Sequence, residues 1–268
     1  MLRVLLTNDD GIDAEGLQAL RRALVALDDV ELAVIAPDGN RSATARSITF
    51  RRPLWVAEIP FEDGTFGYAC DGTPVDCVRL ASLGLIEDFT PDVIVSGINH
   101  GANLGDDITY SGTVAAALEG VVLGIPGIAV SQQSARREMD FRLGNLFDFA
   151  HAAAFTAEVV DRLDDVPLPA GTLLNVNVPA GTPRGAVITV QGRREHQGTI
   201  LEGLDPRRRT YYWIEEGSDH WLSDETSDIH AIRQGYISIS PLQTDTTHHG
   251  ALGALKAWEA ALRNGHLG

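Results

Sequence analysis

Acidic and amide side chains follow the first apolar segment of the chain. Residues 3–7 have the length and the continuous apolar pattern of a strand that is buried on both faces, and Asn8, Asp9 and Asp10 come directly after it. Two adjacent carboxylates repel each other, and a hard divalent cation such as Mg²⁺, Mn²⁺ or Ca²⁺ relieves that repulsion. The alternative for an isolated pair is that one aspartate caps the next helix while the other is solvated.

Two later segments of strand length also end in oxygen-rich loops, at residues 38–42 and 97–103. Because ligands of open α/β sheets bind outside the carboxyl ends of the strands, we expect these loops to lie beside the aspartate pair. The oxygens of Ser42 and Asn99 are therefore candidates to complete the coordination shell of a cation. Ordinary turn chemistry explains the glycines of residues 97–103 equally well, but it does not explain so many amides.

A phosphate site is predicted where a helix begins after Tyr110. Free backbone amides at a helix start, with the hydroxyls of Ser111 and Thr113 beside them, suit a phosphate without requiring a positively charged protein. A plain helix cap by one of these hydroxyls is the alternative. The segment lacks GxxxxGK[ST] and follows no GxGxxG, so a Walker P-loop is excluded and dinucleotide binding has little support.

A possible acid/base pair lies near the C-terminal end. Asp245 and His249 are four residues apart, which on a helical turn would put them side by side. A carboxylate beside an imidazole makes a pair that can transfer protons near neutral pH. His248 and His249 could equally form a metal site or lie in a solvated loop.

Strands and helices alternate through the first two thirds of the chain. We expect strands at residues 3–7, 30–36, 66–70, 92–96, 127–131 and 172–178, and helices at 17–27, 75–86, 113–123 and 143–163. Asp13 is available to cap the first helix. This alternation predicts an α/β fold with a mainly parallel sheet covered by helices.

The alternation ends after Pro167. Strands at 186–191 and 235–241 flank an arginine-rich stretch with an aromatic cluster at 211–213, which predicts hairpins or arms. An amphipathic helix ends the chain. The aromatic cluster indicates either a surface for another subunit or a small satellite core. We expect one domain over residues 1–268, with a core at about 1–180 and a C-terminal extension at about 181–268.

Composition and charge exclude several classes of protein. The 268 residues are 44% hydrophobic and 22% charged, which is typical of a globular protein and not of a disordered, collagenous or coiled-coil chain. A net charge of -16 disfavours a groove for polymeric nucleic acid or anionic lipid. Because no apolar stretch is long enough for a membrane span and the first one is too short for a signal peptide, we expect a cytoplasmic protein. Cys70 and Cys77 match no metal or disulfide pattern and are expected to be buried thiols.

These motifs resemble, in order and spacing, those of the SurE family of survival-protein nucleotidases, and the resemblance covers nearly the whole chain. The matching segments are Leu6-Thr7-Asn8-Asp9-Asp10-Gly11-Ile12, Ala36-Pro37-Asp38 through Arg41-Ser42, Asp71-Gly72-Thr73-Pro74, Ser96-Gly97-Ile98-Asn99, Tyr110-Ser111-Gly112-Thr113-Val114, Asp205-Pro206 with Tyr211-Tyr212-Trp213, Gly235-Tyr236 to Pro241, and Asp245 with His249. The sequence departs from the family pattern at Arg208, where a glycine is common, and at Ser227 and Ser240, where threonines are usual.

The resemblance implies a metal-dependent phosphatase that releases phosphate from nucleoside monophosphates. It implies a Rossmann-like, three-layer α/β/α sandwich whose C-terminal hairpin and helix are exchanged between subunits of a homodimer or homotetramer. One divalent ion per subunit, Mg²⁺ or Mn²⁺, would be ligated by Asp9, Asp10, Ser42 and Asn99. Asn103, Ser111, Gly112 and Thr113 would line the phosphate pocket, and Asp245 and His249 would transfer protons at its floor. The base preference, the choice of 5′ or 3′ phosphate and an exopolyphosphatase side activity stay open.

Three other classes share part of the pattern. A phosphatase of the haloacid-dehalogenase type needs Asp-x-Asp after its first strand, whereas Asp9 and Asp10 are adjacent. A receiver-type signalling module uses a late lysine beside its acidic site, and the single lysine, Lys256, falls in the terminal helix. The third class is a protein that binds metal and nucleotide without turnover, and turnover by the purified protein would exclude it.

Overall fold

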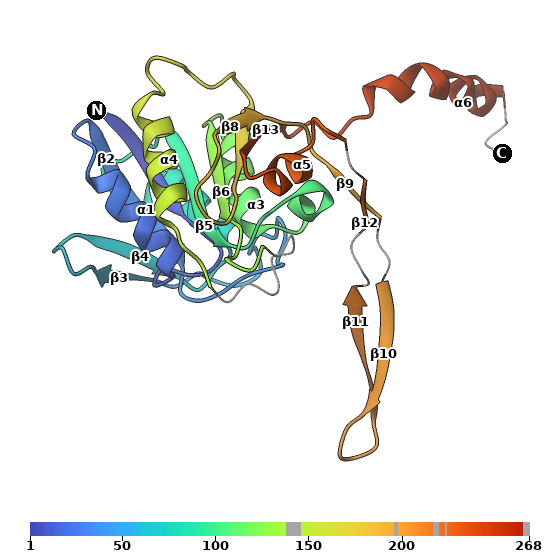
Figure 1. The fold of residues 1–268 in the computed structure, drawn as a ribbon, viewed down its shortest axis with the longest axis horizontal. Coiled ribbons are helices and arrows are strands. Elements are labelled where there is room, and N and C mark those ends of the chain that lie inside the picture. Colours follow the sequence, from blue (N-terminus) through green and yellow to red (C-terminus); the bar gives the residue numbers. More distant parts are fainter. Residues whose placement is uncertain (138–145, 196–197, 217–219, 223, 265–268) are drawn as a thin grey trace.

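The centre of the molecule is one nine-stranded sheet (Figure 1). The computed structural model describes residues 1–137, 146–195, 198–216, 220–222 and 224–264. In spatial order the strands are β3 (Val56–Pro60), β4 (Phe66–Cys70), β2 (Val30–Pro37), β1 (Leu2–Thr7), β5 (Val93–His100), β6 (Gly127–Gln132), β7 (Thr172–Val178), β13 (Ile237–Gln243) and β8 (Ala186–Ile188). Only the pairings of β3 with β4 and of β13 with β7 are antiparallel. The sheet is therefore mainly parallel, as predicted.

Helices cover both faces of this sheet. On one face lie α1 (Glu15–Val25) and α4 (Ala150–Asp161), and on the other lie α2 (Pro74–Leu80) and α3 (Gly112–Val122) (Figure 1). The central strands are apolar on both faces because each face is packed against helices. The arrangement confirms the predicted three-layer α/β/α sandwich.

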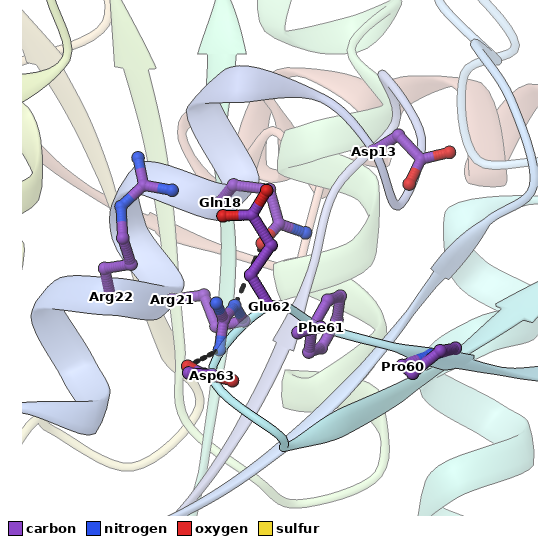
Figure 2. Close-up of a pocket in the computed structure, with 8 residues that line it drawn as sticks. All are labelled: Asp13, Gln18, Arg21, Arg22, Pro60, Phe61, Glu62 and Asp63. Atoms are coloured by element: carbon purple, nitrogen blue, oxygen red, sulfur yellow. Dashed lines mark hydrogen bonds and ion pairs between the residues drawn. The ribbon is translucent and has the colours of Figure 1, made fainter.

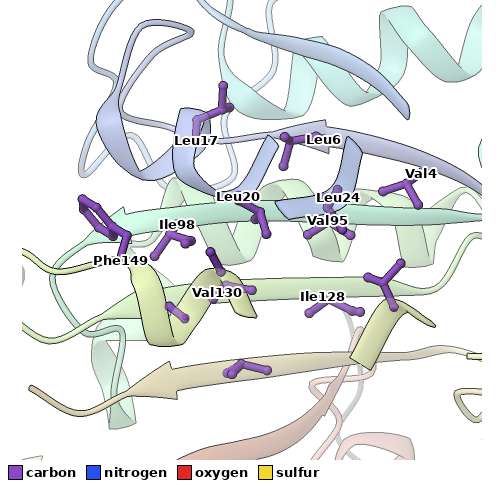
Figure 3. Close-up of a cluster of buried hydrophobic side chains, with 14 of the residues drawn as sticks. Val4, Leu6, Leu17, Leu20, Leu24, Val95, Ile98, Ile128, Val130 and Phe149 are labelled. Carbon is purple, nitrogen blue, oxygen red and sulfur yellow. The ribbon is translucent and has the colours of Figure 1, made fainter. Parts of the chain in front are cut away.

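The largest cluster of buried apolar side chains lies between α1, α4 and the sheet (Figure 3). The leucines that recur at helical spacing on α1 are fully buried: Leu17, Leu20 and Leu24. Burying one such side chain contributes about 2 kcal/mol, so this stripe holds α1, and the loop that joins it to β1, against the sheet. Cys70 and Cys77 are buried free thiols in the cluster on the other face, as predicted.

Beyond β8 the chain leaves the layered body as an arm, returns to it along β13, and leaves it again near its end (Figure 1). The other elements of this part are β9 (Arg193–Glu195), β10 (Gly198–Leu204), β11 (Thr210–Glu216), β12 (His220–Leu222), α5 (Asp228–Arg233), a 3-10 turn at His249–Ala251 and α6 (Leu252–Asn264). The hairpin of β10 and β11 projects away from the body, and α6 projects in a different direction. Tyr211, Tyr212 and Trp213 on the hairpin and Trp258 on α6 are exposed, so the predicted arm is confirmed and these aromatics form no satellite core.

The residues that depart from the family pattern have local roles in this extension. Arg208 adopts a left-handed backbone conformation with φ 61°, a conformation that favours glycine. Ser227 caps α5 by accepting a hydrogen bond from the backbone N–H of His230 at 3.2 Å. The hydroxyl of Ser240 lies 2.8 Å from that of Thr189.

Several predicted helix limits were wrong. Asp13 does not cap α1, which begins after Ala14 without a side-chain cap. Within the helix predicted at 75–86, regular α-helix ends at Leu80 and a π-helical turn continues over Ala81–Leu85, in which Gly84 has φ 99°. The helix predicted at 143–163 begins at Ala150, and residues 143–145 lie outside the described part of the chain.

Two elements were not predicted from the sequence. The edge strand β3 ends in Pro60 and carries only exposed or half-exposed residues, so it lacks the apolar pattern of a buried strand. The helix α5 has only six residues, too few to show helical periodicity. Among the described residues, no helix combines the length and apolarity that a membrane crossing requires.

Candidate active site

The loop after β1 is shaped by Asn8. Its side-chain amide donates to the carbonyl oxygen of Gly11 at 2.9 Å, and its Oδ1 accepts from the backbone N–H of Gly11 at 3.1 Å. These two bonds close a tight turn around Asp9 and Asp10, and neither aspartate caps α1. The helix-cap alternative for the aspartate pair is therefore wrong.

Asp9 is buried and bonded to the start of α3. Thr113 donates a hydrogen bond from its hydroxyl to Oδ1 of Asp9. Burial, followed by the charge of Asp10, raises the pKa of Asp9 from 3.8 to about 6, although the hydrogen bonds from Thr113 and from backbone N–H groups oppose the shift. A buried carboxylate next to a second carboxylate is a position where a bound cation would be strongly stabilising.

Asp10 is held by residues that the motif did not single out. Its Oδ2 lies 2.7 Å from Nδ1 of His100 and accepts the backbone N–H of the same residue at 3.1 Å, while its Oδ1 accepts from Asn40 at 3.0 Å. Burial lowers the pKa of His100, but the hydrogen bond and the charge of Asp10 outweigh burial and raise it above 6.5. Sequence reasoning missed His100 because the contact joins the ends of β1 and β5.

The loop after β2 folds over the aspartate pair. The backbone N–H of Arg41 donates to the carbonyl oxygen of Asp9 at 2.7 Å, and the backbone N–H of Ser42 donates to Oδ1 of Asn40 at 2.9 Å. Ala43 and Ala45 have left-handed backbones, with φ of 58° and 52°. Such conformations cost about 1 kcal/mol or more each, and they bring Ser42 to the mouth of the site.

An irregularity near the end of β5 sets the position of Asn99. The pairing register with β6 shifts between Ser96 and Asn99, and a side chain at Gly97 would collide with the carbonyl oxygen of Val130. The side-chain amide of Asn99 donates to the carbonyl oxygen of Gly101 at 2.8 Å. Among the described residues no donor reaches Oδ1 of Asn99, so this oxygen is available to a ligand.

Asn103 sits in a buried network of amides. Its side-chain amide donates to the hydroxyl of Ser131 at 2.8 Å, and its backbone N–H donates to Oδ1 of Asn177 at 2.8 Å. The side-chain amides of Asn175 and Asn177 both donate to the carbonyl oxygen of Asn103 at 3.0 Å. The network fixes the loop after β5 from the neighbouring strands. Sequence reasoning missed Asn175 and Asn177, whose only signal was two amides within an otherwise apolar strand.

The start of α3 combines a helix cap with a backbone amide, that of Thr113, which hydrogen-bonds to the Asp9 carboxylate. The hydroxyl oxygen of Ser111 accepts from the backbone N–H of Val114 at 3.1 Å, which confirms the plain-cap alternative for this residue. The backbone N–H groups of Gly112 and Thr113 lie in the first turn, where a helix has no acceptor of its own. A Cβ at Gly112 would lie 2.7 Å from the Cβ of Asp9, so only glycine fits there.

One small cavity brings five of the ten predicted site residues together, whereas Asp10, Gly112 and Thr113 do not line it. Its volume is about 20 Å³, enough for one water molecule or one ion. Its lining is Asp9, Ser42, Ala43, Asn99, His100, Asn103, Tyr110 and Ser111. Across the described ranges no three His, Cys, Asp or Glu side chains are grouped to hold a metal. The donor set is instead one of carboxylate, amide and hydroxyl oxygens, which suits a hard cation.

Asp245 and His249 make the predicted contact, but outside this cavity. Oδ2 of Asp245 lies 2.7 Å from Nε2 of His249, and the side chains are 48% and 67% exposed. Hydrogen bonds from Thr247 first, and from His249, lower the pKa of Asp245. Asp245 lines a separate, largely apolar cavity of about 480 Å³ with residues of α3 and β13. The single chain therefore does not bring this pair to the aspartates.

Comparison with known proteins agrees with the geometry. Residues 4–198 match the family model of survival protein SurE. The chain belongs to the SurE family. It is 47% identical to the 5′-nucleotidase SurE of Rubrobacter xylanophilus, over 96% of this chain and 97% of that protein. The 5′-nucleotidase SurE of Myxococcus xanthus is 45% identical, over 98% and 96% of the two chains. The crystal structure of the SurE protein from Aquifex aeolicus superposes with a TM-score of 0.80 at 36% identity, covering 96% and 99%.

A second cavity, larger than the one beside Asp9, is crossed by contacts that hold the fold together. It measures about 460 Å³ and lies between α1 and the turn of β3 and β4 (Figure 2). Arg21 crosses it to Asp63 at 2.5 Å and stacks 4.3 Å from the ring of Phe61. These contacts tie the edge hairpin to α1, away from the strand ends that carry the site.

Proposed function

We propose that this chain is a divalent-metal-dependent nucleotidase that hydrolyses nucleoside 5′-monophosphates to nucleoside and phosphate, with 3′-monophosphates and polyphosphate as the side substrates to test. The observation that carries the proposal is the cavity in which Asp9, Ser42 and Asn99 meet the start of α3. Relatives that are named 5′-nucleotidase and match nearly the full length of this chain support the same reaction. We further propose that the enzyme works in the cytoplasm and binds neither membranes nor polymeric nucleic acid.

Asp9, Asp10, Ser42 and Asn99 would hold one Mg²⁺ or Mn²⁺ per subunit. When bound, the ion would polarise the phosphoryl oxygens and lower the pKa of an attacking water. The free Oδ1 of Asn99 and the buried charge of Asp9 support this ligand set. A site that carries two adjacent negative charges cannot attract a phosphate ester by itself, so the proposal requires a cation.

The phosphate would be bound at the start of α3. Gly112 and Thr113 would line this position: the backbone N–H of Gly112 would donate to the phosphate, while that of Thr113 bonds the Asp9 carboxylate beside it. The helix start presents the positive end of its dipole to the same place. Because the hydroxyl oxygen of Ser111 already accepts the cap bond, its O–H remains to donate to a phosphate oxygen. Asn103, fixed by the amide network, would contact the same group. These donors stabilise charge that grows on the phosphoryl oxygens in the transition state.

Asp245 and His249 are proposed to transfer protons in the assembled protein. The C-terminal extension, residues 181–268, would be exchanged between subunits of a homodimer or homotetramer and would remain part of a single domain. The exposed Tyr212 and Trp213 on the hairpin and Trp258 on α6 support an exchanged extension, because a monomer would leave them in water. Light scattering of the purified protein is expected to give a multiple of the chain mass.

The test is phosphate release by purified protein in EDTA, Mg²⁺ or Mn²⁺. The substrates are nucleoside 5′- and 3′-monophosphates, p-nitrophenyl phosphate and tripolyphosphate. Release is expected to require the cation and to be lost in Asp9→Asn, whereas the matched variant Asp13→Asn, an exposed aspartate in the same loop, is expected to retain it. Cation-independent release would refute the metal requirement. Nucleotide binding without any release of phosphate would refute the proposed enzymatic activity.

A further inference from the structure

His100 makes two hydrogen bonds to one carboxylate oxygen of Asp10. Its ring Nδ1 lies 2.7 Å from Oδ2 of Asp10, and its backbone N–H donates to the same oxygen at 3.1 Å. The Asp10 side chain is only 9% exposed. A carboxylate can only accept, so Nδ1 carries the hydrogen in this contact.

Two phenylalanines fix the plane of the imidazole. The rings of Phe147 and Phe149 make T-shaped contacts with the imidazole of His100. The centroid distances are 5.1 Å and 5.0 Å, and the interplanar angles are 87° and 83°. The two phenylalanine rings are stacked on each other, 5.6 Å apart, and Phe149 is buried. Rotation of the imidazole away from Asp10 would break these contacts, so Nδ1 is held toward the carboxylate.

The hydrogen bonds leave a defined acceptor position on Asp10. Its Oδ2 accepts two hydrogen bonds from His100, which use both lone pairs of that oxygen. Its Oδ1 accepts one bond, from Asn40 at 3.0 Å. The remaining acceptor position of the carboxylate is therefore on Oδ1.

We propose that His100 is a positioning residue for the cation site: it locks Oδ2 of Asp10, so that Oδ1 is the oxygen presented to the metal. The inference rests on the proposed function, because Asp10 needs to be positioned only if it is a ligand. Partners that orient a metal ligand in this way typically change metal affinity about 10- to 100-fold when removed. His100 acts through Asp10 and makes no bond to the metal or substrate.

The experiment measures Mn²⁺ binding to the full-length protein, freed of metal, from the electron paramagnetic resonance signal of unbound Mn²⁺. His100→Ala removes the ring donor and is expected to weaken Mn²⁺ affinity about 10-fold or more. His100→Asn keeps an N–H donor at the position of Nδ1 and is expected to restore most of the affinity. His151→Ala, at an exposed histidine of α4, is the matched control and is expected to bind like wild type.

Activity supplies the second readout. His100→Ala is expected to raise the Mn²⁺ concentration that gives a half-maximal rate. Equal Mn²⁺ affinity in wild type and His100→Ala overturns the inference and leaves the proposed function intact. Equal weakening in His100→Ala and His100→Asn, with wild-type unfolding temperatures, also overturns it, because the hydrogen bond is then not the cause. Absence of Mn²⁺ binding by wild type refutes the metal requirement itself, and the inference with it.

Discussion

The hydroxyl of Thr113 donates a hydrogen bond to Oδ1 of Asp9, and this bond joins the first turn of α3 to the end of β1. Both side chains are buried. The same turn carries Gly112 and follows Ser111, the proposed phosphate donors, so one contact sets the carboxylate relative to them. This geometry makes Thr113 a structural link between the two halves of the proposed site.

Thr113→Val, which replaces the hydroxyl by a methyl of similar size, is expected to lower kcat/KM about 10-fold or more. A hydrogen bond to a charged group contributes about 1.5–3 kcal/mol, and its loss frees the Asp9 carboxylate to reorient. Thr113→Ser keeps the hydroxyl and is expected to stay within a few-fold of wild type. Steady-state kinetics on a nucleoside monophosphate at saturating cation checks both. Wild-type kinetics in Thr113→Val would show that the bond has no role in activity.

Asp9 makes the stability of the metal-free protein depend on pH. Its pKa is about 6 in the folded protein and 3.8 when unperturbed, so between these values the folded state binds more protons than the unfolded state. Stability is therefore highest below the lower value and falls as pH rises to about 6, by about 3 kcal/mol from this group. Urea unfolding in EDTA at pH 4.5 and 7.5 measures the change.

Asp9→Asn is the control for this pH dependence. An asparagine at this position does not titrate. The loss of stability from pH 4.5 to 7.5 in wild type, minus the loss in Asp9→Asn, is therefore the contribution of Asp9. Mg²⁺ at pH 7.5 is expected to restore stability to wild type and not to Asp9→Asn, because the cation replaces the proton. Parallel pH profiles of the two proteins would contradict the assignment.

The sequence predicted the layered fold and the grouping of three site residues, but not the contacts that surround them. Asp9, Ser42 and Asn99 could be grouped because parallel strands end at one edge of the sheet, and the cavity contains all three. The contact of His100 with Asp10 depends on the register shift near the end of β5, which no local pattern reveals. The predicted pairing of Asp245 with His249 was right, but the place of the pair depends on the path of an extension that projects from the body.

Gly112→Ala is expected to abolish activity. A Cβ at this position would lie 2.7 Å and 2.8 Å from the Cβ and Oδ2 of Asp9, and both residues are buried. Gly253→Ala is the matched control, since no atom lies within 4 Å of its added Cβ and alanine favours the helix. Phosphate release and unfolding temperature are measured for both. Substantial activity in Gly112→Ala would show that Asp9 can shift without loss of function.

A buried ion pair connects the root of the arm to the segment before the phosphate site. Nη1 of Arg194 in β9 lies 3.1 Å from Oδ1 of Asp107, and both side chains are 2% exposed. Asp107 belongs to the 3-10 turn at Gly105–Thr109, which runs directly into Ser111. Arg194→Ala removes this buried, charged hydrogen bond and is expected to destabilise the protein by about 1.5–3 kcal/mol.

Arg209→Ala is the matched control for Arg194→Ala. Arg209 pairs with Asp205 at 2.8 Å, but its side chain is 75% exposed, and exposed pairs contribute about 1 kcal/mol or less. Urea unfolding of both variants measures the difference in stability. Because the turn at Gly105–Thr109 positions Ser111, we also expect Arg194→Ala to lower kcat/KM in native buffer, whereas Arg209→Ala does not. Equal stability of the two variants would show that burial of the Arg194 pair makes no net contribution to the fold.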